Sequence, residues 1–124
     1  MERYVLVMLG GALGAALRYG LGAWVQAWGG PGFPWSTFFI NLSGSFVMGI
    51  VLRLNLEGAL SPEWRLFLAV GVLGGYTTFS TFSFETLTLV QQGEWLRALL
   101  YVGGSVLLGF LLVWVAYSWA GRWT

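Results

Sequence analysis

The amino-acid sequence contains no cysteine and no histidine among its 124 residues. Without cysteine the chain has no disulfide and no thiolate nucleophile. Without histidine it also lacks imidazole acid–base chemistry and the usual zinc ligands. Five glutamates remain as groups for enzymatic chemistry, and only Glu85 lies well inside an apolar segment. These absences argue against an enzyme.

Charge is also scarce, because only 9% of the residues are charged whereas 57% are hydrophobic. An average soluble domain has roughly 25% charged residues, so this composition indicates that lipid is the main solvent. The six cationic residues are all arginines and stand singly along the chain. Such an arrangement provides no basic run for nucleic-acid binding.

Four apolar segments predict an all-α fold, a single four-span membrane domain covering residues 1–124. A membrane-crossing helix needs roughly 20 apolar residues, so four of them use most of the chain. The glycines and prolines of residues 29–34 predict the first loop. Ser61 followed by Pro62 predicts a helix N-cap with proline in the first helical position. The expected spans are residues 4–28, 35–54, 64–90 and 94–121.

Seven of the eight tryptophans lie near the proposed span ends, where an aromatic belt at the membrane interface is expected. They are Trp24, Trp28, Trp35, Trp64, Trp95, Trp119 and Trp123. Small residues four apart recur inside the spans, and this spacing lets two membrane helices approach closely. The pairs are Gly10 with Gly14, Gly11 with Ala15, and Ser105 with Gly109. Helix packing is their expected role.

The third span contains an unusual polar stretch, in which Gly74 and Gly75 are followed after one residue by Thr77 and Thr78. Glycine costs a helix roughly 1 kcal/mol relative to alanine, so the glycine pair is where the helix is expected to stop. Unwound backbone inside a bilayer needs protein groups or a water-filled cavity to satisfy it, and such breaks often hold ions. The alternative is a kinked helix whose hydroxyls bond back to their own backbone.

Polar and aromatic side chains inside the spans are the candidate ion contacts. The Asn41 amide offers two N–H donors, which suit a small anion, although an interhelical hydrogen bond is the other interpretation. Phe79 and Phe82 lie three apart on one helix face next to the polar stretch. Aromatic ring edges are electropositive, so two rings can line an anion path. Ordinary packing is the alternative for both rings.

The fourth span carries a short polar stripe at four-residue spacing, formed by Tyr101, Ser105 and Gly109. Such a stripe also occurs in plain helix packing. Arg18 is costly at its depth in the first span, so it should be paired or face water, and a structural role is expected. Glu85 is either a vestibule residue or an interfacial one.

Three segments carry ordered motifs of small, polar and aromatic residues. Residues 10–19 read GGALGAALRY, residues 41–46 read NLSGSF, and residues 74–82 read GGYTTFSTF. With the chain length and the four-span layout, these motifs resemble the CrcB/Fluc family of fluoride channels. The resemblance covers three of the four spans. It implies an antiparallel dimer with two fluoride pathways, placed in the cell (plasma or inner) membrane, with the third helix interrupted near residues 74–78.

The resemblance also implies roles for individual residues. In the family's pattern an asparagine faces the ion path, two phenylalanine ring edges contact fluoride, and a polar track follows the fourth span. The matching residues are Asn41, Phe79, Phe82, Tyr101 and Ser105, and further candidate contacts are Thr37, Ser80, Thr81 and Glu85. Backbone carbonyls matching those of Gly74 and Thr77 hold a structural sodium ion at the dimer centre. At Gly109 the sequence lacks a serine hydroxyl expected in the track.

The expected function is a passive, fluoride-selective channel that lets fluoride leave the cytoplasm down its electrochemical gradient. A four-span multidrug exporter is a weaker alternative, because residues 4–28 contain no carboxylate for proton coupling. A small structural or assembly subunit of a membrane complex is another. The partner is expected to be a second copy in an antiparallel homodimer, and an opposed pair of different chains stays open. Arg3, Arg53, Arg65 and Arg122 fall on one side and Arg97 on the other, a bias that argues mildly against dual topology.

Overall fold

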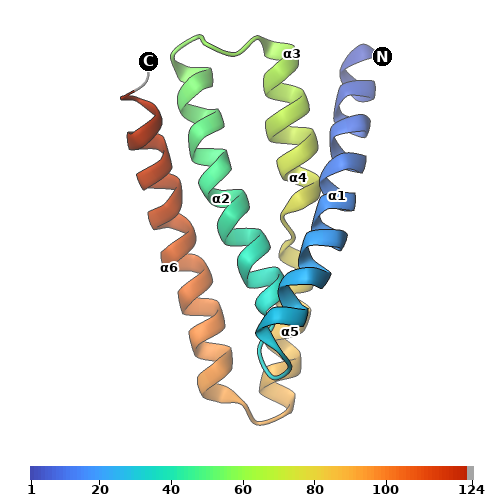
Figure 1. The fold of residues 1–124 in the computed structure, drawn as a ribbon, viewed down its shortest axis with the longest axis vertical. Coiled ribbons are helices and arrows are strands. Elements are labelled where there is room, and N and C mark those ends of the chain that lie inside the picture. The colour runs from blue at the N-terminus through green and yellow to red at the C-terminus, as the bar shows by residue number, and fades with distance from the viewer. Residues whose placement is uncertain (123–124) are drawn as a thin grey trace.

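The computed structural model describes residues 1–122 and is all-helical (Figure 1). Four of its helices are long and apolar enough to cross a membrane, as the sequence predicts. They are α1 (Glu2–Gly29), α2 (Trp35–Leu56), the segment Pro62–Gln91, and α6 (Trp95–Ala120). Every expected span boundary lies within two residues of the observed one. Trp123, expected near a span end, lies outside the described residues.

The third span is built from several elements. These are α3 (Pro62–Arg65), the π-helical η1 (Leu66–Leu73), α4 (Gly74–Tyr76) and α5 (Phe79–Gln91). The expected start is confirmed: Trp64 N donates a hydrogen bond of 3.3 Å to the Ser61 hydroxyl, and Pro62 occupies the first helical position. Thr77 and Thr78 are the two residues between α4 and α5.

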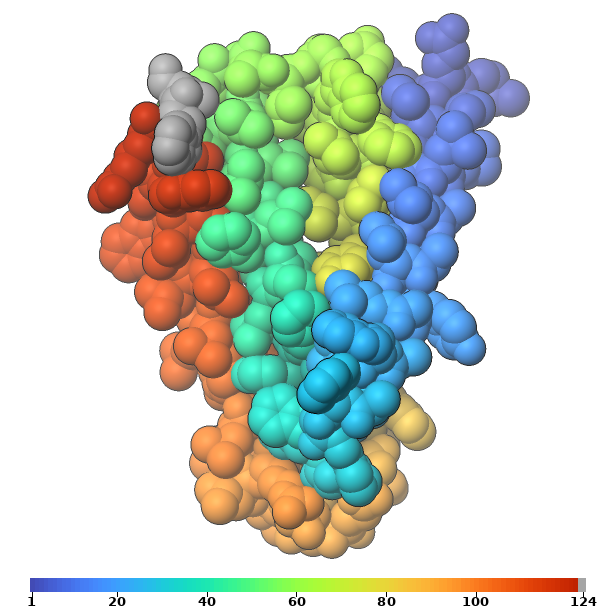
Figure 2. Space-filling view, viewed as in Figure 1, coloured from blue at the N-terminus to red at the C-terminus, as the bar shows by residue number. Residues whose placement is uncertain are grey.

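The four spans run side by side, with both termini and the α2–α3 connection at one end (Figure 1). The α1–α2 and α5–α6 loops lie at the other end. The main packing partners are α2 with α6 and α1 with η1. In the space-filling view η1 lies against α1, whereas small openings remain between η1 and α2 (Figure 2). The bundle is therefore two tight helix pairs with a looser seam between them.

Glycine makes the tight contact between α1 and the third span possible. Gly10 and Gly14 are buried against the backbone of η1. A Cβ atom placed on Gly75 would lie 2.6 Å from the carbonyl oxygen of Gly11 and would collide with it. The predicted packing role is confirmed for Gly10 and Gly14, because only a residue without a side chain lets the two backbones approach this closely.

An aromatic cluster joins α5 to α6 at the other end of the molecule. Leu89, Ala98 and Tyr101 are its buried core, and Phe82 packs against them. The rings of Phe82 and Tyr101 have centroids 4.9 Å apart and a tilt of 51°. This cluster fixes α5 on α6 through side chains, in contrast to the backbone contacts of η1.

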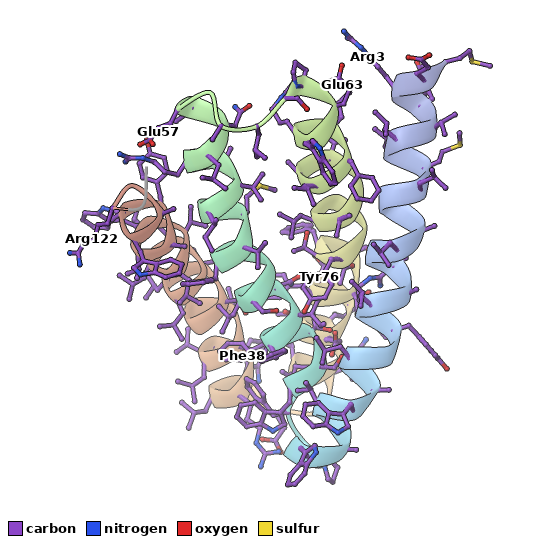
Figure 3. The ribbon with its side chains drawn as sticks, turned by 45° about the horizontal axis from the view of Figure 1, so that its top comes forward. Arg3, Phe38, Glu57, Glu63, Tyr76 and Arg122 are labelled. Carbon is purple, nitrogen blue, oxygen red and sulfur yellow. The ribbon has the colours of Figure 1, made fainter. Side chains whose placement is uncertain are left out.

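Charged residues lie mainly at the ends of the spans. Figure 3 shows Arg3, Glu57, Glu63 and Arg122 at the end that holds both termini. There Arg53 forms an ion pair with Glu57, which lies one helical turn further along the chain. The Arg53 guanidinium lies 4.9 Å from the Tyr117 ring centroid. This placement keeps the charges near the membrane–water interface, where their solvation costs least.

Candidate functional site

The backbone leaves the helical conformation at two threonines in the middle of the third span. Thr77 has φ −82° and ψ 155°, and Thr78 has φ −146° and ψ 122°. The sequence predicts an interruption near residues 74–78 that begins at the glycine pair. In the structure Gly74 and Gly75 are helical and α4 ends at Tyr76, so the extended residues are Thr77 and Thr78, within the predicted range. Gly75 makes a close contact with α1, so its role is in helix packing and not in unwinding the helix.

Asn41 of α2 forms hydrogen bonds with the extended segment through both the oxygen and the nitrogen of its amide. The backbone N–H of Thr78 donates to Asn41 Oδ1 at 2.9 Å, and Asn41 Nδ2 donates to the Thr78 carbonyl at 3.1 Å. The interhelical hydrogen bond considered for Asn41 is therefore present. One of the two Nδ2 hydrogens suffices for it, so the amide keeps a second donor for another acceptor.

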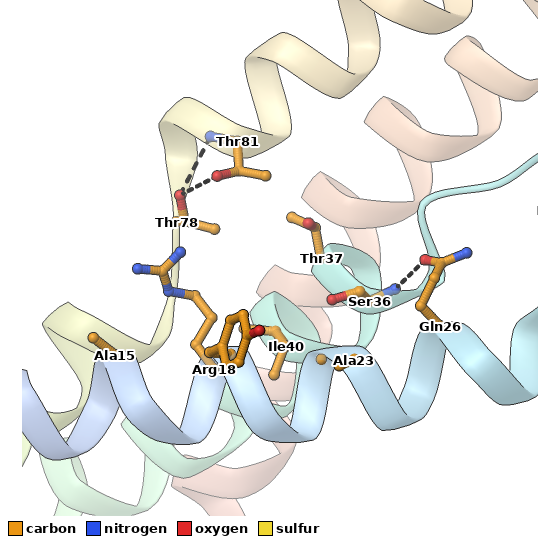
Figure 4. Close-up of a pocket in the computed structure, with 11 residues that line it drawn as sticks. Ala15, Arg18, Ala23, Gln26, Ser36, Thr37, Ile40, Thr78 and Thr81 are labelled. Carbon is orange, nitrogen blue, oxygen red and sulfur yellow. Dashed lines mark hydrogen bonds between the residues drawn. The ribbon is translucent and has the colours of Figure 1, made fainter.

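Thr78 caps the N-terminus of α5, the half-helix that follows the break. Its Oγ1 accepts a hydrogen bond from Thr81 N at 3.3 Å and contacts Thr81 Oγ1 at 3.2 Å (Figure 4). Ser80 Oγ lies 3.4 Å from the same Thr78 oxygen. Three hydroxyls thus gather at the start of α5, where the helix dipole favours negative charge.

Carbonyl groups next to the break lose their helical hydrogen-bond donors, among them those of Gly74 and Thr77. In a continuous α-helix the N–H of Thr78 would donate to the Gly74 carbonyl, and the N–H of Thr81 to the Thr77 carbonyl. Both N–H groups donate to side chains instead. Within residues 1–122 no donor reaches either carbonyl oxygen. The carbonyls predicted to hold a cation are therefore available to one.

Arg18 of α1 reaches the same region. Its Nε donates to the Gly75 carbonyl at 3.1 Å, so this charged side chain has a backbone partner inside the bundle. It also lines a cavity of about 430 Å³ between α1, α2 and the break (Figure 4). Thr37, Thr78 and Thr81 present hydroxyls to the same cavity. A fixed positive charge and several neutral donors therefore share this space.

A second cavity, of about 300 Å³, also borders the break. Asn41, Ser45, Thr78 and Phe79 line it together with apolar side chains of α2 and α6. Thr78 belongs to the lining of both cavities. The extended segment therefore borders both cavities.

Phe79 and Phe82 lie close together but have different surroundings. Their ring centroids are 5.9 Å apart with a tilt of 47°. Phe79 is 79% exposed on the surface of the single subunit, whereas Phe82 packs on Tyr101 in the α5–α6 cluster. Phe79 is therefore free to contact a partner or an ion, and Phe82 also has a packing role.

The predicted polar stripe of α6 lies inside the subunit. The hydroxyl oxygens of Tyr101 and Ser105 are buried and have no hydrogen-bond partner within residues 1–122. A buried hydroxyl left unpaired costs about 1–3 kcal/mol, so these two groups call for a partner such as water or an ion. Neither residue lines the two cavities at the break. On the facing helices the Thr37 hydroxyl donates a short hydrogen bond to the Glu85 carboxylate.

Two residues near the site, Thr78 and Gln26, have no individual role predicted from the sequence. Thr78 was part of a recognised motif without a role of its own, although a threonine directly before a helix is a usual N-cap signal. Gln26 had no signal, because its partners are distant in the loop: its Nε2 donates to the carbonyls of Gly30 and Phe33 at 2.7 Å and 3.1 Å. Such contacts follow only from how the loop closes.

A family model described as CrcB-like protein, Camphor Resistance (CrcB), matches residues 5–117. The chain belongs to the CrcB family. Among similar curated proteins, one from a strain of Thermus thermophilus is named fluoride-specific ion channel FluC and is 65% identical over 121 residues, covering 98% of this chain and 95% of its own. A protein of the same name from a second Thermus thermophilus strain is 64% identical over 98% of this chain and 97% of its own. Another protein of that name, from Hyphomonas neptunium, is 51% identical over 94% of this chain and 96% of its own.

Proposed function

We propose that this CrcB family member is a passive, fluoride-selective channel and not an enzyme. The observation that supports it best is the break in the third span, where Asn41 and Thr78 place neutral hydrogen-bond donors beside two cavities. Relatives named as fluoride-specific ion channels share up to 65% of its residues over nearly the whole chain. The selectivity for fluoride is transferred from those relatives.

The chemistry of the break suits a small, strongly hydrated anion. Neutral amide and hydroxyl donors replace the hydration shell without holding the ion as tightly as a fixed charge at the same point would. The N-terminus of α5 adds a partial positive charge. The ring edges of Phe79 and Phe82 extend the donor set toward the subunit surface. An anion that passes Thr78 therefore meets weak, multiple contacts.

The pathway is completed by a second copy in an antiparallel homodimer. Phe79, which is 79% exposed, and the cavity that it lines lie where a partner subunit can close them. An antiparallel pair has its two-fold axis in the membrane plane, so the two breaks meet at the same depth. Two copies then give two pathways, one beside each break.

A sodium ion fits the backbone carbonyls of Gly74 and Thr77, which lack donors within residues 1–122. Two carbonyls from each copy would surround the ion at the two-fold axis. No cluster of three or more acidic residues exists among the described residues, so uncharged oxygens are the available ligands. When bound, the ion supplies positive charge that offsets the converging carbonyl dipoles.

Passive flow is sufficient for the proposed role in the cell membrane. Fluoride enters cells as neutral HF, dissociates in the less acidic interior and is trapped there as the anion. The inside-negative membrane potential drives the anion out through an open pathway, at about 2.3 kcal/mol per 100 mV and unit charge. No energy-coupling domain is required.

Purified protein in liposomes tests the selectivity. Vesicles loaded with potassium fluoride or potassium chloride, with valinomycin to relieve the charge, should release fluoride within the time in which chloride stays inside. An ion-selective electrode measures each halide, and protein-free vesicles give the leak rate. Equal release of both halides would contradict a selective channel.

Single introduced cysteines test the orientation, because the chain has no cysteine of its own. Ala59→Cys lies in the α2–α3 connection and Gln92→Cys in the α5–α6 loop, and both positions are exposed. With an impermeant maleimide added from outside, each variant should be labelled in roughly half of the molecules. Complete labelling of one variant and none of the other means a fixed orientation.

A further inference from the structure

Two side chains determine which backbone carbonyls at the break are free. The N–H of Thr78 donates to Asn41 Oδ1 at 2.9 Å, and the N–H of Thr81 donates to Thr78 Oγ1 at 3.3 Å. These are the two N–H groups that a regular helix would direct to the carbonyls of Gly74 and Thr77. The same two carbonyls are the proposed cation ligands.

We infer that Asn41 and Thr78 are positioning residues for the cation at the dimer centre, because their oxygens divert the N–H groups that would otherwise occupy its carbonyl ligands. The inference rests on the proposed cation site. Neither side chain touches the cation in this assignment; each acts through the hydrogen bond that it accepts.

The two residues act on opposite sides of the break. Asn41 reaches it from α2, so the Gly74 carbonyl stays free only while α2 is docked on the third span. Thr78 lies within the break and caps α5, so its effect on the Thr77 carbonyl is local. Arg18 donates a hydrogen bond to the carbonyl of Gly75, a residue between Gly74 and Thr77 in sequence. Within residues 1–122 the carbonyls of Gly74 and Thr77, and that of Tyr76 between them, are left without a donor.

Asn41 also links the cation to the anion path. Its Oδ1 accepts from Thr78, whereas its Nδ2 keeps one hydrogen beyond the bond to the Thr78 carbonyl and lines the second cavity. The acceptor end of the amide thus maintains the cation ligands and the donor end serves the anion. The two functions of one side chain are separable by substitution.

Asn41→Leu removes both ends of the amide at similar volume, whereas Asn41→Asp keeps an acceptor oxygen for the Thr78 N–H in either protonation state and places an acid on the anion path. We expect the Leu variant to lose its response to sodium. The Asp variant should keep that response and lose fluoride flux. Both variants are compared with the parent in sodium and in N-methylglucamine.

The sequence offers a site-specific probe, because Thr77–Thr78 is its only pair of consecutive threonines. Protein made with threonine labelled with ¹³C at the carbonyl and with ¹⁵N gives one correlation between a carbonyl carbon and the next amide, that of Thr77 with Thr78. In the parent, this NMR peak should shift with sodium concentration. In Asn41→Leu it should stay fixed, and in Asn41→Asp it should still shift.

Thr78 is tested by an isosteric pair with thermal unfolding as the readout. Thr78→Ser keeps the hydroxyl cap, and Thr78→Val removes it. The increase in unfolding temperature that sodium gives the parent should persist in the Ser variant and vanish in the Val variant. Thr86→Val is the matched control, since Thr86 donates to the Phe82 carbonyl at 2.8 Å within α5 and caps nothing at the break.

The outcomes separate this inference from the channel proposal. A sodium response that survives in Asn41→Leu and Thr78→Val overturns it, and so does a parent that has no sodium response while still conducting fluoride. That last result would leave the channel proposal standing. A parent that responds to sodium but releases fluoride and chloride equally would refute selectivity and keep the positioning roles.

Discussion

The two halves of the third span are built on different principles. The first half, Pro62–Tyr76, has no serine or threonine and packs its backbone directly on α1 through glycine. The second half, Phe79–Gln91, has five hydroxyl residues and packs through side chains on α6. Close backbone packing therefore constrains the residues of the first half, whereas hydrogen bonding constrains those of the second. The break lies between these two halves.

The second half also shows how the chain separates structural hydroxyls from functional ones. Ser83, Thr86 and Thr88 donate to the carbonyls four residues earlier, at 2.8–3.0 Å. For these three the alternative considered from the sequence, hydroxyls bonded to their own backbone, is right. Ser80 and Thr81 gather instead at Thr78. Only the first turn of α5 thus presents hydroxyls to the break.

The largest expected effect is a steric one in the first half. Gly75→Ala places a Cβ 2.6 Å from the Gly11 carbonyl oxygen, so the helices must separate. We expect a loss of about 1–3 kcal/mol in the free energy of unfolding, measured by thermal or denaturant unfolding in detergent. Gly20→Ala in α1 is the control, because nothing lies within 4 Å of its Cβ and it should be neutral or stabilising. Equal losses of stability in both variants would contradict the view that close backbone packing constrains the first half.

A smaller effect should distinguish the two phenylalanines of the second half. Phe82→Ile removes the ring contact with Tyr101 and should cost about 0.5–1.5 kcal/mol of stability. Phe79→Ile changes an exposed side chain and should leave stability nearly unchanged. Both should reduce fluoride flux sharply, because each loses an electropositive ring edge. Normal flux in both variants would assign the rings to packing alone.

A smaller change in stability than that of Phe82→Ile is expected for the Tyr101 hydroxyl on α6. Tyr101→Phe removes a buried O–H that has no partner within residues 1–122 and that we expect water or an ion to satisfy. Because the net contribution of one such hydrogen bond is small, the free energy of unfolding should change by less than about 1 kcal/mol, in either direction. Fluoride efflux should nevertheless fall, because the track loses a polar group. Tyr4→Phe, at an exposed position near the N-terminus, is the control. A clear loss of stability in Tyr101→Phe would mean that the hydroxyl has a structural partner.

The candidate site was only partly predictable. The sequence identified Asn41 and the threonine pair as polar groups at membrane depth, because such groups stand out against an apolar background. The predicted range of residues 74–78 contains the break, but the sequence placed its start at the glycine pair, since a glycine suits both unwinding and close helix contact. The structure distinguishes the two, because Gly75 lies against Gly11 while Thr77 and Thr78 are extended.

The four spans, the helix start at Ser61 and the family could all be predicted from the sequence, because they follow from hydropathy, capping chemistry and ordered motifs along the chain. Which hydrogen-bond donors reach which acceptors across helices depends on how the helices pack. Asn41 and Thr78 are 37 residues apart, and Arg18 and Gly75 are 57 apart. Hydrogen bonds act over about 3 Å, so these pairings exist only once α1 and α2 have docked on the third span.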